Sequence, residues 1–265
     1  MCKTCGCEVT PGNAHLAYRP VRQHTTAVDV LGRLLAANDH AAEHNRAHFD
    51  DHGVLALNLM SAPGSGKTAL IEATADALGR ELRLGVLVGD LATDNDAERI
   101  RTHGIPAVQI TTGEACHLDA HMIHDALHQM ALDGLDVLFI ENVGNLVCPA
   151  SFDLGQHRNV ALLSFTEGDD KPAKYPVLFR SADLVLLTKS DLARHMEDFD
   201  AARAEGCLRA LANAAPLHAL SARRGINLHP WFDWVRGELA AVRARRRAAF
   251  HPGAHHHDHG EGLAR

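Results

Sequence analysis

One segment of the sequence combines the residue types that bind a phosphate chain. Residues 55–70 read LALNLMSAPGSGKTAL, a strand-like apolar run, a glycine-bearing loop and a Lys-Thr pair that opens a helical pattern. Backbone N–H groups from about Gly64 to Thr68 would point at phosphate oxygens, and the helix N-terminus adds its partial positive charge. Lys67 is expected to neutralise the β- and γ-phosphates, and the Thr68 hydroxyl to bind Mg²⁺. The segment therefore predicts a P-loop that binds a nucleoside triphosphate.

The loop departs from the usual pattern G-x-x-x-x-G-K-[ST] at one position, where Ser61 replaces the first glycine. That position tolerates a small residue more readily than the second glycine position does. A glycine turn followed by a lysine on a helix is the alternative interpretation, and the order of strand, loop and helix favours the P-loop. The expected phosphate-binding residues are Gly64, Ser65, Gly66, Lys67 and Thr68.

Two short motifs, each directly after a predicted strand, indicate guanine as the base. Thr188-Lys189-Ser190-Asp191 matches the [NT]-K-x-D motif of GTPases, and Ser221-Ala222-Arg223 resembles the S-A-[KR] loop that meets the guanine O6 through a backbone N–H. Asp191 would accept the N1–H and the 2-amino group of guanine, and leaving this carboxylate unpaired opposite adenine would be costly. Lys189 would lay its alkyl stem across the base. A helix N-cap is the alternative role for Asp191, and one residue can fill both roles.

Carboxylates at two further strand ends are candidates for the hydrolytic step. Asp90 ends the run LGVLVGD, and we expect it to orient the attacking water or to reach Mg²⁺ through water. Asp94 and Asp96 are alternatives, with helix capping as their competing role. Glu141 opens the sequence ENVG in the place of a D-x-x-G switch segment, where it would contact Mg²⁺ through water. Gly144 would let its N–H approach the γ-phosphate, so the order of this segment can depend on that phosphate.

Three thiols at the N-terminus form the first predicted metal site. Cys2, Cys5 and Cys7 fall within six residues, and Gly6 lets the chain turn to offer the third sulfur. Removal of Met1 would add the amine of Cys2 as a fourth ligand. Three thiolates and an amine suit a square-planar Ni²⁺, with tetrahedral Zn²⁺ as a competitor. Exposed cysteines without a function are the alternative, although exposed free thiols are a liability.

A second predicted metal site combines Cys116 and His117 with Cys148. Cys148 lies directly downstream of Gly144, so a metal ion held there would respond to a rearrangement of the switch segment. Three ligands from one chain leave the coordination sphere open, which favours a site shared across a dimer. A buried structural cysteine pair is the alternative.

Histidine is unusually frequent, at 20 of 265 residues, and much of it lies in rows. Imidazoles at i and i+4 on a helix chelate Ni²⁺ or Zn²⁺, and such sites would buffer or store metal more weakly than thiolates. Exposed histidines without metal, and an expression tag for the tail, are the alternatives. The rows are His40, His44, His48 and His52; His121, His124 and His128, expected to share one helical face with His117; and His255, His256, His257 and His259.

Composition and charge exclude several classes of protein. A formal net charge of −7 gives no reason to expect nucleic-acid binding. No apolar stretch approaches the roughly 18 residues that a membrane span needs, and the N-terminus MCKTCGC lacks the apolar core of a signal peptide. A cytoplasmic, reducing location is therefore expected, with the six cysteines as thiols or metal ligands.

The elements that would position these residues alternate between strands and helices. Short, nearly continuous apolar runs between helical patterns predict an α/β P-loop NTPase fold, a mostly parallel sheet covered by helices on both faces. Ligands gather at the carboxyl ends of such strands. The expected strands are 54–60, 84–89, 107–111, 136–140, 160–165, 184–187 and 217–220, and the expected helices are about 27–51, 68–78, 95–102, 118–132, 197–212 and 231–246. The expected parts are a flexible cysteine-rich nickel-binding tail (1–25), a helix with a histidine stripe (26–53), a GTPase domain (54–250) and a flexible histidine-rich tail (251–265).

The motifs together resemble the hydrogenase nickel-incorporation GTPases of the HypB family. The sequences that carry the resemblance are MCKTCGC, LNLMSAPGSGKTAL, GDLATDNDAERI, TGEACHLDA, IENVGNLVCPA, GDDKPAKYP and LTKSDL. The resemblance implies a SIMIBI-class G domain that hydrolyses GTP slowly. It implies delivery of nickel, with a HypA-type partner, to the large subunit of [NiFe]-hydrogenase. Lys67, Thr68 and Asp191 match the family's nucleotide residues.

The same resemblance assigns the thiol clusters. Cys2, Cys5 and Cys7 match the family's N-terminal high-affinity nickel motif, and Cys116, His117 and Cys148 match its G-domain metal site, which sits at a nucleotide-dependent homodimer interface. Ni²⁺ is the expected cargo, and Zn²⁺ is an alternative occupant of the G-domain site. The competing interpretation is a nickel storage protein with an accessory GTPase, because the chain carries more histidine than the plain family pattern does. The N-terminal C-x-x-C-G-C argues against a related urease-maturation GTPase.

Overall fold

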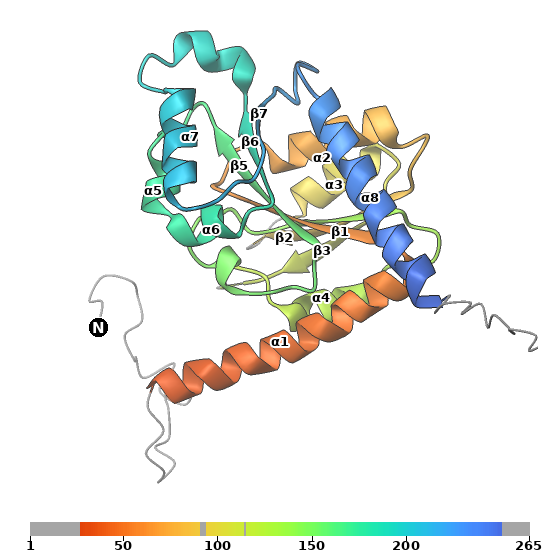
Figure 1. Cartoon of the computed structure of the whole chain (residues 1–265). Coiled ribbons are helices and arrows are strands. Elements are labelled where there is room, and N and C mark those ends of the chain that lie inside the picture. Colours follow the sequence, from red (N-terminus) through yellow and green to blue (C-terminus); the bar gives the residue numbers. More distant parts are fainter. Residues whose placement is uncertain (1–26, 91–93, 114, 251–265) are drawn as a thin grey trace, which may run out of the picture. The chain divides into compact units, whose positions relative to one another are not determined.

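The computed structural model describes residues 27–90, 94–113 and 115–250, with only the backbone course given for residues 27–34 and 250 (Figure 1). The chain divides into two compact units, residues 1–36 and residues 37–265. Helix α1 (Ala27–His52) begins in the first and ends in the second. Both predicted tails lie outside the described residues. The predicted domain limits at 25, 53 and 250 therefore stay predictions.

Seven strands form one all-parallel sheet in the order β3-β2-β4-β1-β5-β6-β7. All seven predicted strands are confirmed, with ends shifted by at most two residues. From β1 the chain crosses to β2, which lies on one side of β1 in the sheet, whereas β5, β6 and β7 extend the sheet on the other side of β1. The loop after β1 therefore lies at a topological switch point. The strands are β1 (Leu55–Ser61), β2 (Leu84–Asp90), β3 (Ala107–Thr111), β4 (Val137–Glu141), β5 (Arg158–Ser164), β6 (Leu184–Thr188) and β7 (Leu217–Ala219).

Helices cover both faces of the sheet, as predicted (Figure 1). Leu55, Leu57 and Leu59 of β1 share one core cluster with α2, α3 and α8, whereas Ala56 lies in a cluster with Phe49 of α1 and with α4. Alternate residues of one strand therefore supply opposite cores. Helices α6 and α7 pack on the Ala56 face beneath β5 and β6. The further helices are α2 (Lys67–Leu78), α3 (Asn95–Thr102), α4 (Ala120–Leu127), α5 (Lys171–Lys174), α6 (Pro176–Ser181), α7 (Ala201–Ala210) and α8 (His229–Phe250), with 3₁₀ turns η1 (Pro149–Ser151) and η2 (Ser190–His195).

Three helix predictions need correction, and capping explains two of them. The helix expected over 118–132 is α4, which begins at Ala120 because the Asp119 side chain accepts from Met122 N at 2.8 Å, and which already ends at Leu127. The helix expected from 197 begins at Ala201, where Asp200 accepts from two backbone N–H groups. Helix α8 is longer than the predicted 231–246, and α5 and α6 were not predicted. Among the described residues, no helix combines the length and apolar character that crossing a membrane requires.

Candidate nucleotide pocket and metal centre

A cleft of about 990 Å³ lies over the carboxyl ends of the central strands. It brings together loops that follow β1, β2, β4, β6 and β7, which are separated by long stretches of sequence. Its lining contains every predicted nucleotide and hydrolytic residue, and Asp96 as well, but not Asp94, which pairs with Arg101 at 3.1 Å. The predicted residues that line it are Gly64, Ser65, Gly66, Lys67, Thr68, Asp90, Glu141, Gly144, Lys189, Asp191, Ser221 and Ala222.

The loop after β1 has the backbone curl that the motif predicts. Gly64 and Gly66 have φ values of 73° and 99°, in the left-handed region that glycine adopts without strain. An added Cβ would meet nothing within 4 Å at either position, so the requirement comes from the backbone angle and not from crowding. The Thr188 hydroxyl donates to Ser65 O at 2.6 Å, which ties the start of the guanine motif to the phosphate loop.

Lys67, Thr68 and Glu141 form a buried charged group at the floor of the cleft. Lys67 Nζ donates to Ser61 Oγ at 3.0 Å, and Thr68 Oγ1 donates to Glu141 Oε1 at 2.9 Å. Burial raises the pKa of Glu141 to about 7, and the Lys67 charge and the Thr68 hydrogen bond oppose that rise. Burial also lowers the pKa of Lys67, with Glu141 opposing. The second carboxylate oxygen of Glu141 has no hydrogen-bond partner. A buried, unpartnered carboxylate oxygen beside the P-loop threonine fits Mg²⁺, a hard cation that takes oxygen ligands.

The base end of the cleft is built from the loops after β6 and β7. Lys189 has a left-handed φ of 59° and caps η2, so Asp191 lies inside this turn and is not its N-cap. A hydrogen bond with Ser221 lowers the pKa of Asp191, and Arg224 Nε lies 4.0 Å from its carboxylate. An ionised carboxylate thus faces the cleft between the two predicted guanine motifs.

The segment after β4 lies directly against the phosphate loop. A Cβ added at Gly144 would come within 2.9 Å of Pro63 Cα, so only glycine lets the two backbones approach this closely. The buried Asn142 side chain accepts from Leu118 N at 3.3 Å and donates to Asn58 Oδ1 at 3.2 Å. One amide therefore connects the switch segment, strand β1 and the loop that carries Cys116.

Sequence reasoning missed two polar residues at this site, the buried Asn142 as a connecting residue and the half-buried Glu167. Glu167 Oε1 accepts from Ser65 Oγ at 2.6 Å, and its Oε2 is buried without a partner. Glu167 lies in the loop after β5, so the rule that ligands gather at carboxyl ends of strands was a usable signal for it. Asn142 follows β4 in the same way, but its role depends on contacts with distant segments.

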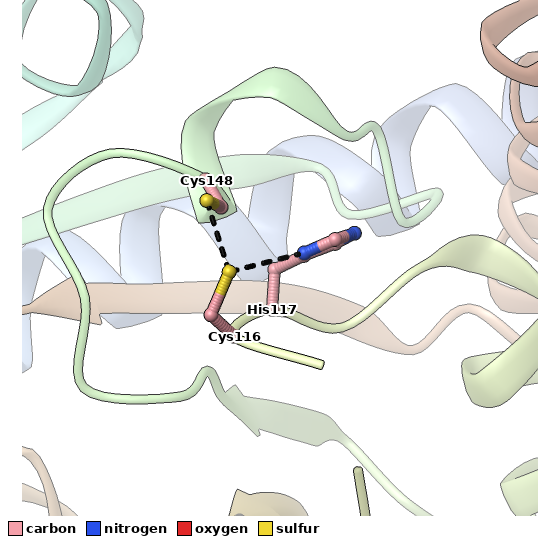
Figure 2. A group of neighbouring side chains, drawn as sticks. All are labelled: Cys116, His117 and Cys148. Atoms are coloured by element: carbon pink, nitrogen blue, oxygen red, sulfur yellow. Dashed lines mark hydrogen bonds between the residues drawn. The ribbon is translucent and has the colours of Figure 1, made fainter. Parts of the chain in front are cut away.

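Cys116, His117 and Cys148 are brought together, as predicted (Figure 2). Their candidate ligand atoms all lie within 4.8 Å of one another; the two sulfurs are 3.0 Å apart, and Cys116 Sγ lies 3.9 Å from His117 Nδ1. Cys116 is exposed and the other two are half-buried. The alternative of a buried cysteine pair is therefore wrong. Two thiols and an imidazole form a donor set for a borderline or soft cation such as Ni²⁺ or Zn²⁺.

The surroundings of this centre orient its ligands. The His117 ring stacks on Phe152 with centroids 4.0 Å apart, and burial lowers the pKa of His117, which keeps the imidazole neutral and able to bind metal. The hydrogen bond with Cys116 and burial raise the pKa of Cys148. Asn145 Nδ2 donates to Cys116 O at 3.2 Å, so the segment after Gly144 holds the backbone of one ligand and carries another. The two predicted sites are thus physically continuous.

Several of the other predicted metal ligands lie outside the described residues. They are Cys2, Cys5, Cys7 and the histidines of the C-terminal tail. The prediction that His117 shares a helical face with the α4 histidines is wrong, because His117 precedes α4 and His128 is its C-cap residue.

Comparison with known proteins gives consistent results. The family model described as CobW/HypB/UreG, nucleotide-binding domain, matches residues 55–218. A hydrogenase maturation factor HypB from Azotobacter chroococcum is 47% identical over 245 residues, which cover 88% of this chain and 78% of the relative. Among solved structures, HypB from Archaeoglobus fulgidus matches with a TM-score of 0.72 and 41% identity over 77% of this chain and 100% of that one. HypB from Helicobacter pylori in complex with nickel matches with a TM-score of 0.70 and 38% identity, covering 83% and 99%.

Proposed function

Because the chain belongs to the HypB family of hydrogenase maturation factors, we propose that it is a GTP-hydrolysing nickel metallochaperone. Its cargo would be Ni²⁺, delivered to the large subunit of [NiFe]-hydrogenase. The observation that carries the proposal is the continuity of one short segment: residues 141–148 begin at Glu141 beneath the P-loop threonine, touch the phosphate loop at Gly144 and end at the ligand Cys148. The relative from Helicobacter pylori, solved with nickel, supports the choice of metal.

The geometry supports a specific gating step. A γ-phosphate on the loop Gly64–Thr68 would lie beside Gly144, whose backbone is already pressed against Pro63. Gain or loss of that phosphate would displace Gly144, and the displacement would reach Cys148 four residues later. A change in the position of one thiolate relative to the other two ligands changes the affinity of the centre for the metal ion. GTP hydrolysis would thereby trigger release of the metal ion.

The hydrolytic roles follow from the same cleft. Lys67 would neutralise the β- and γ-phosphates, and Asp90 at the end of β2 would orient the attacking water. Mg²⁺, held by Thr68 with Glu141 directly or through water, would neutralise charge on the phosphates. Ionised Asp191 would select guanine through its N1–H and 2-amino group. The intrinsic rate is expected to be low.

The open coordination sphere of the Cys116 centre supports a GTP-dependent homodimer in which two chains share the ion. A HypA-type nickel chaperone and the hydrogenase large subunit are the further partners proposed, in the cytoplasm. The competing proposal is a nickel store with an accessory GTPase, and the histidine rows on α1 and α4 favour it.

One substitution separates the two proposals. Lys67→Ala should abolish GTP hydrolysis and hydrogenase maturation in cells while nickel binding by the histidine rows persists. A nickel store would keep supporting maturation after this change, and that result would overturn the gating proposal. Arg245→Ala, which removes an exposed positive charge from α8, is the matched control and should leave maturation intact.

A further inference from the structure

A row of four imidazoles on α1 and α4 plays no part in the gating proposed above. The ring centroids of His44 and His48, on α1, are 4.6 Å apart, and those of His124 and His128, at the end of α4, are 4.9 Å apart. His44 and His124 connect the two pairs across the helices, with centroids separated by 5.1 Å. The histidine spacing within each helix was visible in the sequence, but the pairing between helices was not.

Buried polar contacts hold the two helices in this register. Asn38 Oδ1 accepts from Ala120 N at 2.9 Å, and Asn45 Nδ2 donates to Ala120 O at 2.8 Å. Two side chains of α1 thus bind both backbone polar groups of the first residue of α4. Both asparagines are buried. His44 is adjacent to Asn45, and His124 lies one helical turn after Ala120. The spacing of these imidazoles is thus set by the core of the protein, and Figure 1 shows the two helices side by side.

The ring separations match those of imidazoles that share one cation. With a metal–nitrogen distance of about 2.1 Å, two imidazoles bound at 90–110° to one another have ring centroids roughly 4.5–5.2 Å apart. The three separations in the row fall within this range. His44, His48 and His128 are exposed and His124 is half-buried, so their rings can turn until the nitrogens converge.

We propose that a Ni²⁺ or Zn²⁺ ion binds between α1 and α4 with His44 and His124 as its shared ligands. His48 and His128 offer further imidazoles from their own helices. Borderline cations of this class bind neutral imidazole well. The site is separate from the thiolate centre, yet α4 begins three residues after His117, so the ion would lie on the helix that follows that centre. Occupancy would also fasten α1 to α4.

The first test counts nickel ions bound per full-length chain near pH 7.5, where free imidazoles are mostly neutral. His44→Gln and His124→Gln should each remove one ion, and the double variant should remove no more than either single variant, because both ligands serve the same ion. Loss of two ions from the double variant would mean that each helix binds its own ion, and no loss from any variant would mean that the row binds none. Either result overturns the shared site. His195→Gln, at an exposed position on η2, is the matched control and should leave the count unchanged.

A second test needs no substitution. Crystals of the full chain soaked in Ni²⁺ should give an anomalous scattering peak within ligand distance of both His44 and His124. A peak on one helix alone, or none between the helices, contradicts the proposal.

Discussion

The buried carboxyl of Glu141 predicts a pH-dependent penalty on the stability of the nucleotide-free protein. Its pKa rises from 4.5 to about 7 on folding, so between these values the folded state binds more protons than the unfolded state. Stability then falls as the pH rises through this window, and the full penalty is present above pH 7. A rise from 4.5 to about 7 corresponds to about 3 kcal/mol.

Glu141→Gln removes the titrating group while keeping an oxygen that accepts from Thr68. Urea unfolding of the wild type and the variant, without nucleotide or Mg²⁺, should be compared at pH 5 and pH 8. The two proteins should differ little at pH 5, and the variant should be more stable by about 3 kcal/mol at pH 8. The variant should also hydrolyse GTP poorly, because the proposed Mg²⁺ site would lose its negatively charged oxygen donor.

A matched control is Glu205→Gln on α7, an exposed glutamate whose ion pair with Arg209 is 2.9 Å long. This change should shift stability by less than about 1 kcal/mol at either pH. If Glu141→Gln also leaves the difference between pH 5 and pH 8 unchanged, Glu141 is ionised at no cost in the folded protein. The reasoning that burial raises the pKa of Glu141 and so destabilises the folded protein at high pH would then be refuted.

Four further outcomes are expected. Asp191→Asn should weaken GTP binding by roughly tenfold to a hundredfold, the worth of a hydrogen bond to a charged group, and shift preference toward xanthosine triphosphate; unchanged selectivity in a competition assay would remove the guanine assignment. Gly144→Ala forces a Cβ to within 2.9 Å of Pro63 Cα, an overpacking worth about 1–3 kcal/mol, and should abolish the difference in metal affinity between the GTP and GDP states in paired titrations. Cys148→Ser should lower nickel affinity at the Cys116–His117–Cys148 centre, seen as a weaker thiolate-to-nickel absorption band, of which the predicted N-terminal cysteine site keeps its own part, whereas Cys207→Ser should leave the band unchanged. Sedimentation should show a larger dimer fraction with GTP than with GDP, and equal fractions would exclude nucleotide-controlled assembly.

The parallel sheet and the nucleotide cleft were largely predictable from sequence, because both depend on local patterns. Seven apolar runs of strand length set the sheet, and the P-loop and guanine motifs each follow a strand end, where parallel strands place their loops together. The grouping of Cys116, His117 and Cys148 also followed from this rule, since Cys148 lies just beyond the end of β4.

What sequence reasoning missed depends on contacts between distant segments. The prediction that His117 shares a face with the α4 histidines failed because Asp119 caps the helix after His117. Asp119 is the second residue of the helix expected over 118–132, and its role as the cap was not recognised. The pairing of His44 with His124 needs the docking of α1 on α4, which no local pattern encodes. Glu167 was missed because its contact with Ser65 joins the loops after β5 and β1, which are neighbours in the sheet but distant in the sequence.

The amides of Asn142, Asn58 and Asn159 form a relay across β4, β1 and β5, each donating to the oxygen of the next at 3.0–3.2 Å. Such a relay resists sliding of these strands past one another and so fixes their register. The relay therefore braces β1 against β5 and against Asn142, the residue that follows β4. Because the chain beyond Asn142 lies outside these braced strands, we expect the proposed nucleotide-driven movement to occur there, in the segment that carries Cys148.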